Sequence, residues 1–187
     1  DGDGDDDDDD DGDAVGTDVP HVPAATLEVL VRRLAAAQAV PRCIEVVRDA
    51  SPLTDNSVRG AAAIVATDVA MHPLLQATAL DELVAAGGVS ALRGLLKVHD
   101  DLFVAGRVAA ACLRRLLASG GEAVREAALA CDVGGAAVSL IRRAGPSTME
   151  GLSGLAALEA ARVVREVARW PRLRPTVVEA GALQGSL

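Results

Sequence analysis

The stretch LVAAGGVSAL, residues 83–92, decides the fold class, because parts of it recur twice further along the chain. Its glycine Gly87 returns as Gly134 and Gly181, and both intervals are 47 residues long. Apolar or small residues precede each glycine, and an apolar residue follows two positions later, at Val89, Ala136 and Leu183. Glycine tolerates the left-handed backbone of a helix end, so each glycine is expected to end a helix. The regular interval predicts an array of helical repeats.

A second pair of segments keeps the same interval. AAIVA at residues 62–66 corresponds to AAACL at residues 109–113. Towards the N-terminus the interval lengthens slightly, since Val40 lies 49 residues before Val89. Alanine-rich segments of this kind let neighbouring helices approach closely.

Each unit divides into a first helix, a short second helix and a long third helix. In two consecutive units the expected helices span residues 74–86, 89–97 and 102–117, and then 122–133, 136–143 and 150–170. Two pairs, Ser119 with Glu122 and Ser147 with Glu150, have the spacing of a capping box. In that motif two side chains satisfy free backbone N–H groups at a helix start.

Residues 1–23 differ from the rest of the chain and are predicted to be a disordered acidic tail. Eleven of the first 20 residues are Asp, and none is basic. Charge repulsion and the lack of apolar side chains keep such a segment from packing a core. The whole chain has a formal charge of −9, but without those 20 residues it has 16 acidic and 18 basic residues.

Composition excludes several classes of function. The aromatic residues are Phe103 and Trp170 alone, and the body is nearly neutral, so a nucleic-acid surface with stacking rings and a basic field is not expected. No apolar run reaches the roughly 20 residues of a membrane span. Three widely spaced cysteines, Cys43, Cys112 and Cys131, suit neither a disulfide framework nor a zinc site. They predict buried, reduced thiols in a cytoplasmic or nuclear protein.

The turn VEAGAL at residues 178–183, like residues 83–92, resembles the armadillo repeat, and so do the alanine-rich third helices. The resemblance covers residues 24–187 and implies an all-α, right-handed α-solenoid of about three repeats. The expected units span residues 24–73, 74–120 and 121–170, with a partial unit at 171–187. HEAT repeats, with two helices per unit, are the structural alternative. Because the last unit stops after its opening turn, the chain is expected to be cut from a longer array.

Nuclear import adaptors of the armadillo family carry a Trp and an Asn four residues apart on the third helix. The matching positions here hold other residues, so a classical adaptor is not expected. The same positions are nevertheless predicted to line the concave groove; they are Ile64, Asp68, Ala111, Arg115, Arg162 and Glu166.

The acidic tail allows two further hypotheses. Asp7, Asp9, Asp11 and Gly12 have the spacing of a calcium-binding loop, but a run of aspartates produces that spacing by chance. Alternatively, the tail contacts basic surfaces on a partner or on the chain itself, with Arg114, Arg115, Arg142 and Arg143 as candidates. No specific metal site is predicted.

The dispersed histidines, including that of the His99–Asp100–Asp101 loop, do not suggest catalysis. The chain has no phosphate loop, dinucleotide fingerprint or nucleophile elbow. No enzyme activity and no cofactor are therefore expected. The leading hypothesis is a protein-interaction scaffold that binds an extended peptide or a helix along its third helices. The alternatives are a regulatory repeat segment of a larger enzyme, such as a ubiquitin ligase, and a cation-responsive module that uses the tail.

Overall fold

A computed structural model of the protein describes residues 23–51, 54–98, 103–144 and 152–181, and its regular secondary structure there is all helical. Within these residues there are ten helices and no strand, as the helical periodicity predicts. The acidic tail, which the sequence predicts to be disordered, lies outside them up to residue 22.

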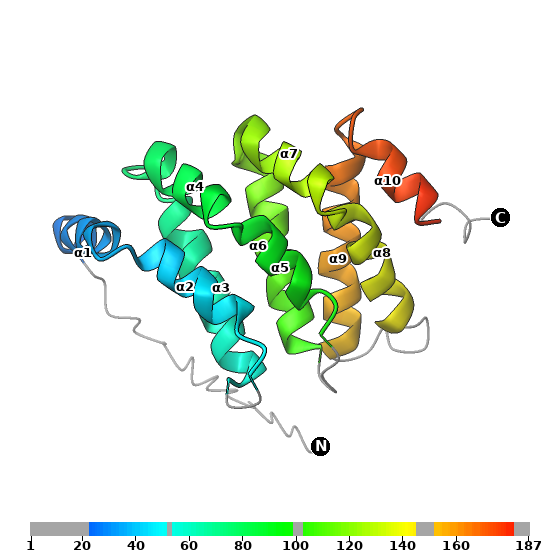
Figure 1. Ribbon diagram of the computed structural model, residues 1–187, viewed down its shortest axis with the longest axis horizontal. Coiled ribbons are helices and arrows are strands. Elements are labelled where there is room, and N and C mark those ends of the chain that lie inside the picture. The colour runs from blue at the N-terminus through cyan, green and yellow to red at the C-terminus, as the bar shows by residue number, and fades with distance from the viewer. Residues whose placement is uncertain (1–22, 52–53, 99–102, 145–151, 182–187) are drawn as a thin grey trace, which may run out of the picture.

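The helices follow one another in triplets of similar layout (Figure 1). The first helices are α1 (Ala24–Ala36), α4 (Gln76–Ala85) and α7 (Gly121–Ala130). The second helices are α2 (Ala39–Arg48), α5 (Gly88–Leu95) and α8 (Val133–Ala144). The third helices are α3 (Asn56–Ala70), α6 (Val104–Ser119) and α9 (Leu152–Ala168), and α10 (Arg174–Glu179) comes last. The expected ranges 89–97 and 102–117 differ from α5 and α6 by no more than two residues at either end.

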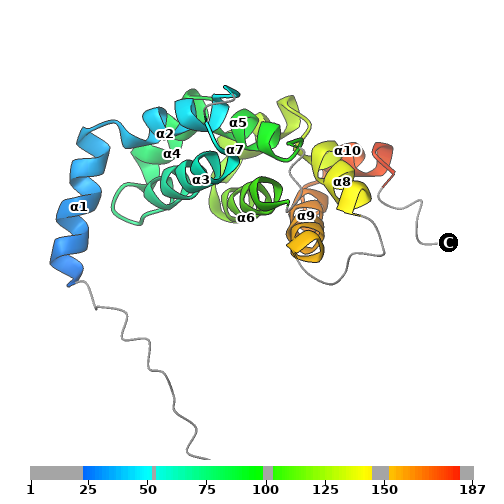
Figure 2. The ribbon, with the colours of Figure 1, turned by 90° about the horizontal axis from the view of Figure 1, so that it is seen from below.

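Corresponding helices of successive triplets lie side by side. Helix α6 packs against both α3 and α9, and α5 packs against both α2 and α8. Figure 2 shows the third helices as one row and the second helices as another, with α1 projecting away at one end. The third helices therefore present a surface that runs along the molecule.

The turn between a first and a second helix contains a left-handed residue in each triplet. These residues are Gln38 with φ 53°, Gly87 with φ 68° and Asp132 with φ 53°, and Gly181 with φ 78° follows α10. A positive φ is strained for a residue with a Cβ, and glycine adopts it without that strain. The predictions that Gly87 and Gly181 follow a helix end are confirmed.

Gly134 does not end a helix, contrary to the sequence prediction, because it lies in the first turn of α8. Asp132 occupies the left-handed position instead, and its Oδ1 accepts a hydrogen bond from the backbone N–H of Gly135 at 2.9 Å. The absence of a side chain at Gly134 matters for packing instead. A Cβ at this position would lie 3.0 Å from Cγ2 of Val177, so the glycine lets α10 approach α8 closely.

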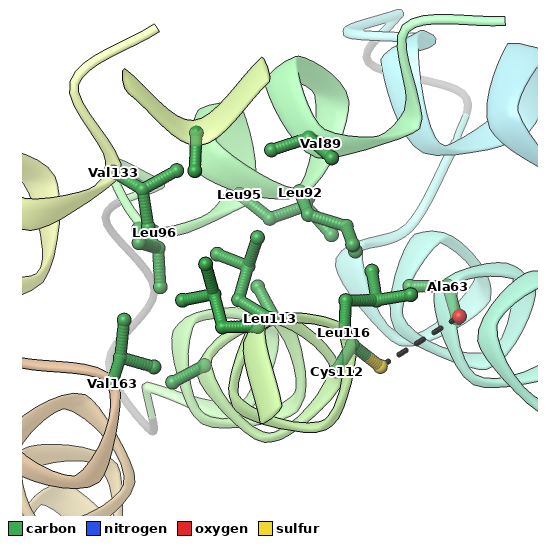
Figure 3. Close-up of a cluster of buried hydrophobic side chains, with 14 of the residues drawn as sticks. Ala63, Val89, Leu92, Leu95, Leu96, Cys112, Leu113, Leu116, Val133 and Val163 are labelled. Atoms are coloured by element: carbon green, nitrogen blue, oxygen red, sulfur yellow. Dashed lines mark hydrogen bonds between the residues drawn. The ribbon is translucent and has the colours of Figure 1, made fainter. Parts of the chain in front are cut away.

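The core is made mostly of leucine, valine and alanine side chains, and a large part of it lies between the second and third helices (Figure 3). Leu92 and Leu95 of α5 and Leu113 and Leu116 of α6 are fully buried. Burying such a side chain stabilises a fold by about 1.5–3 kcal/mol relative to leaving it exposed. Leucine at the layer interface therefore holds the second and third helices together.

Small residues fill the contact between third helices. Ala63 of α3 is fully buried, and a Cβ at Gly60 would lie 3.8 Å from Val108 of α6. The thiol of Cys112 donates a hydrogen bond to the Ala63 carbonyl oxygen at 3.7 Å, which links α6 to α3 (Figure 3). The expectation that these segments pack closely is met.

The predicted capping boxes are not found among the described residues. Only Gly120 separates α6 from α7, so Ser119 is still helical, and α7 begins without a side-chain cap. The prediction for Ser119 is therefore wrong, and Ser147 lies outside the described residues. A cap that sequence reasoning missed is Asp55, whose Oδ1 accepts a hydrogen bond from the Ser57 N–H at 2.8 Å at the start of α3.

The cysteines are less uniformly buried than predicted. Cys112 is buried, whereas Cys43 and Cys131 are only half-buried, and all three thiols are free. Burial raises the pKa of each thiol above its ordinary value.

In the described part of the chain, no helix combines the length and the apolar character that crossing a bilayer requires.

Candidate peptide-binding surface on the third helices

A hollow of about 290 Å³ opens on the surface of the third helices and spans all three triplets. It is called the third-helix hollow below. Residues of α3, α6 and α9 line it; they are Ile64, Arg107, Val108, Ala111, Cys112, Arg115, Leu155 and Glu159. Because α6 packs against both α3 and α9, residues about 47 positions apart meet in one concavity.

Apolar side chains on this surface remain accessible to solvent. Ile64 is 41% exposed and Leu155 is 45% exposed, although the core nearby is closely packed. Leu158 of α9 and Val65 of α3 are exposed as well. Exposed aliphatic side chains that gather in a concavity mark a candidate interaction site more strongly than isolated ones do.

The charged groups around the hollow are mostly paired with each other. Arg115 lies 2.5 Å from Asp68, and Arg114 lies 3.2 Å from Glu159, which also pairs with Arg162. Each pair crosses from one third helix to the next or ties one turn of α9. Arg107 is the exception, because its guanidinium group forms no hydrogen bond or ion pair within the described part of the chain.

The structure brings together five of the six positions predicted to line a groove. Ile64, Ala111 and Arg115 line the third-helix hollow directly. Asp68 is joined to it through Arg115, and Arg162 through the lining residue Glu159.

Glu166 does not lie open to the groove, contrary to the sequence expectation. It is buried, with 5% of its surface exposed, and pairs with Arg169 at 2.8 Å and with Arg165 at 3.7 Å. Its position follows from helix periodicity: the neighbouring Val167 and Val163 are fully buried, so Glu166 lies near the edge of the apolar face. The arginines satisfy a carboxylate that would otherwise be costly to bury.

Sequence reasoning missed five residues that line the hollow: Arg107, Val108, Cys112, Leu155 and Glu159. The repeat interval contains the signal that could have found two of them. Leu155 lies 47 residues after Val108, and Glu159 lies 47 residues after Cys112. Extending the register to every residue that faces the same way on α6 and α9 would have placed them in the hollow.

Cys112 is the thiol that lines the third-helix hollow. Burial raises the pKa of this thiol, which keeps it protonated and weakly nucleophilic near neutral pH. The described part of the chain contains no group of three or more His, Cys, Asp or Glu residues placed to hold a metal ion. The loop His99–Asp100–Asp101 and the calcium-loop spacing at Asp7–Gly12 lie outside the described residues.

Comparisons with known proteins add no further constraint. No protein-family model, no curated protein and no solved structure matches this chain.

Proposed function

We propose that the chain is a protein-interaction scaffold, a right-handed α-solenoid of armadillo-like repeats that binds a partner peptide or helix along its third helices. The observation that carries this proposal is the third-helix hollow, which combines exposed Ile64 and Leu155 with the unpaired Arg107. Side-by-side packing of corresponding helices supports the repeat assignment.

The chemistry of the hollow favours a partner segment with a large apolar side chain and a carboxylate nearby. An inserted leucine or phenylalanine side chain would remove apolar surface of Ile64 and Leu155 from water, at about 25 cal/mol per Å². A carboxylate of the same segment would pair with Arg107, whose guanidinium group can bind it through two hydrogen bonds. The other ion pairs at the rim remain as they are and shape the site.

The test is a selection of random peptides on the full chain, followed by affinity measurement of the enriched peptides by fluorescence anisotropy. We expect enriched peptides to combine an apolar anchor with acidic residues. Leu155→Glu should weaken their binding at least tenfold, because it places a charge where an apolar side chain inserts. Arg107→Glu should weaken binding several-fold, with the largest effect on the most acidic peptides.

The matched control is Leu129→Glu on α7. Leu129 is 39% exposed, similar to Leu155, but it belongs to a first helix and does not line the hollow. Peptide affinity should stay within about twofold of the wild type. If Leu129→Glu and Leu155→Glu weaken binding equally, or if Leu155→Glu has no effect, the third-helix hollow is not the binding site.

A further inference from the structure

Charge is distributed unequally among the three kinds of helix. The second helices carry five arginines and one glutamate, a net +4: Arg42, Arg48, Arg93, Arg142 and Arg143 against Glu45. The first helices carry three basic and five acidic residues, a net −2. The third helices carry six basic and three acidic residues, a net +3, but most of these charges are paired with each other.

The cations of the second helices are not neutralised by neighbouring carboxylates. Within the described residues, none of the ion pairs involves a second helix. Arg48 and Arg143 instead donate hydrogen bonds to backbone carbonyl oxygens, Arg48 to Ala86 and Arg143 to Val98 at 3.3 Å. Their guanidinium groups tie one triplet to the next and are engaged in the structure.

Three other cations converge on a hollow of about 310 Å³ between α5 and α8. These are Arg93, Lys97 and Arg142, and the concavity is called the basic hollow below. The Nε atom of Arg93 is buried without a hydrogen-bond partner in the described part of the chain. Arg142 makes a long hydrogen bond of 3.4 Å to the Gly181 carbonyl oxygen, and the Lys97 ammonium group has no partner among the described residues.

One carboxylate, that of Asp132, lines the basic hollow. Its Oδ1 already accepts the Gly135 N–H, so it caps α8 and compensates only part of the positive charge. Three cations against one carboxylate leave a net charge of +2 around the hollow. Closely placed cations of this kind repel one another, and an anion that enters between them relieves the repulsion.

We infer that the basic hollow binds the Asp-rich N-terminal segment of the same chain, residues 3–13. Nine of these eleven residues are Asp, the densest negative charge in the sequence. Carboxylate groups match the bidentate donors of Arg93 and Arg142 and the point charge of Lys97. The basic hollow and the third-helix hollow lie on different helices, so this inference does not depend on the proposed function.

The N-terminal segment is long enough to reach the basic hollow. Helix α1 has 13 residues and is about 20 Å long, and the two steps from α2 through α5 to α8 add about 20 Å at usual helix spacings. Residues 10–23 alone span up to about 45 Å when extended. This length exceeds the roughly 40 Å to the basic hollow, so residues 3–13 are within reach of it.

The structure narrows the sequence-based candidates for the tail contact. Arg114 and Arg115 are already paired with carboxylates on the third helices, and Arg143 is engaged with carbonyl oxygens. Of those four candidates only Arg142 lines the basic hollow. Arg93 and Lys97, which the sequence did not single out, complete the site.

The test uses a zero-length carbodiimide, which joins a carboxylate and an amine in direct contact as an amide. Lys97 is the one lysine of the sequence, so its cross-links report on this site alone. In the chain of residues 1–187 we expect a cross-link from Lys97 to an aspartate of residues 3–13 in the monomer, identified by peptide mass spectrometry. Its yield should fall about fivefold between 20 mM and 500 mM NaCl, because salt screens the attraction.

Two variants sharpen the outcome, with circular dichroism confirming that each still folds. The double variant Arg93→Ala, Arg142→Ala should lower the Lys97 cross-link about fivefold although the lysine itself is unchanged. In the variant Arg107→Lys, the matched amine on the third-helix face should gain little cross-linking to the tail. Equal yields at positions 97 and 107, cross-links between molecules only, or a Lys97 cross-link to Asp132 only would each overturn the proposal.

Discussion

The left-handed residues at the turns between first and second helices make a prediction at the scale of single residues. Gln38 has φ 53° and ψ 43°, and its side chain makes no cap hydrogen bond for α2. The left-handed conformation costs a non-glycine residue roughly 1–2 kcal/mol. We expect Gln38→Gly to raise the free energy of unfolding by about 0.5–1 kcal/mol, since greater freedom in the unfolded chain offsets part of the gain. Chemical denaturation measures the change.

Asp132 provides the contrasting case. Its φ is also 53°, but its carboxylate accepts the Gly135 N–H at the start of α8. Asp132→Gly relieves the strain and removes the cap, which is worth about 1 kcal/mol, so the free energy of unfolding should stay level or fall. If Asp132→Gly stabilises the protein as much as Gln38→Gly does, the cap contributes nothing.

At the scale of one helix, two glycine-to-alanine substitutions should have opposite signs. In α8, a Cβ at Gly134 would meet Cγ2 of Val177 at 3.0 Å, so Gly134→Ala should destabilise the protein by about 1–3 kcal/mol through overpacking against α10. In α5, a Cβ at Gly94 would meet no atom within 4 Å. Gly94→Ala should therefore stabilise by about 0.5–1 kcal/mol through helix propensity.

Thermal unfolding followed by circular dichroism measures both variants on the same scale. The two changes add the same methyl group, so a difference in sign isolates the contact with α10. A stabilising Gly134→Ala would mean that α10 does not pack closely on α8 in solution.

Helices were predictable from this sequence because their apolar periodicity and their breaks recur. The 47-residue spacing of the glycines did not locate every turn correctly. The left-handed residues that follow α1, α4, α7 and α10 lie at positions 38, 87, 132 and 181, and the third of them falls two residues before Gly134. Asp132 can replace glycine there because its side chain also caps the following helix. A glycine pattern alone cannot separate a turn glycine from one required by a neighbouring helix.

At the scale of the whole molecule, the candidate site was predictable in position but not in composition. The repeat register placed Ile64, Ala111 and Arg115 on one surface, and the structure brings them into one hollow. The burial of Glu166 follows from its place on α9, and its partner Arg169 is only three residues away. By contrast, Arg115 of α6 is held by Asp68 of α3, which leaves Arg107 as the unpaired cation of the hollow. Side-chain partners from different triplets cannot be read from the spacing along one chain.

The last prediction concerns how stability is shared along the molecule. Helix α6 packs on both α3 and α9, so the middle triplet supports both of its neighbours, whereas α8 belongs to the last triplet. Leu113 of α6 and Leu140 of α8 are both fully buried. Replacing either leucine with alanine leaves a cavity and should lower the free energy of unfolding of the surrounding helices by about 2–5 kcal/mol.

Hydrogen–deuterium exchange with mass spectrometry would locate the two effects. Leu113→Ala should accelerate amide exchange in α2–α3 and in α8–α9 alike, since both rest on the middle triplet. Leu140→Ala should accelerate exchange in α8–α10 and leave α2–α3 close to the wild-type rate, because local opening of one end need not expose the other. Equal acceleration in α2–α3 by both variants would show that the helices unfold as a single cooperative unit and would contradict the stacked, neighbour-by-neighbour coupling.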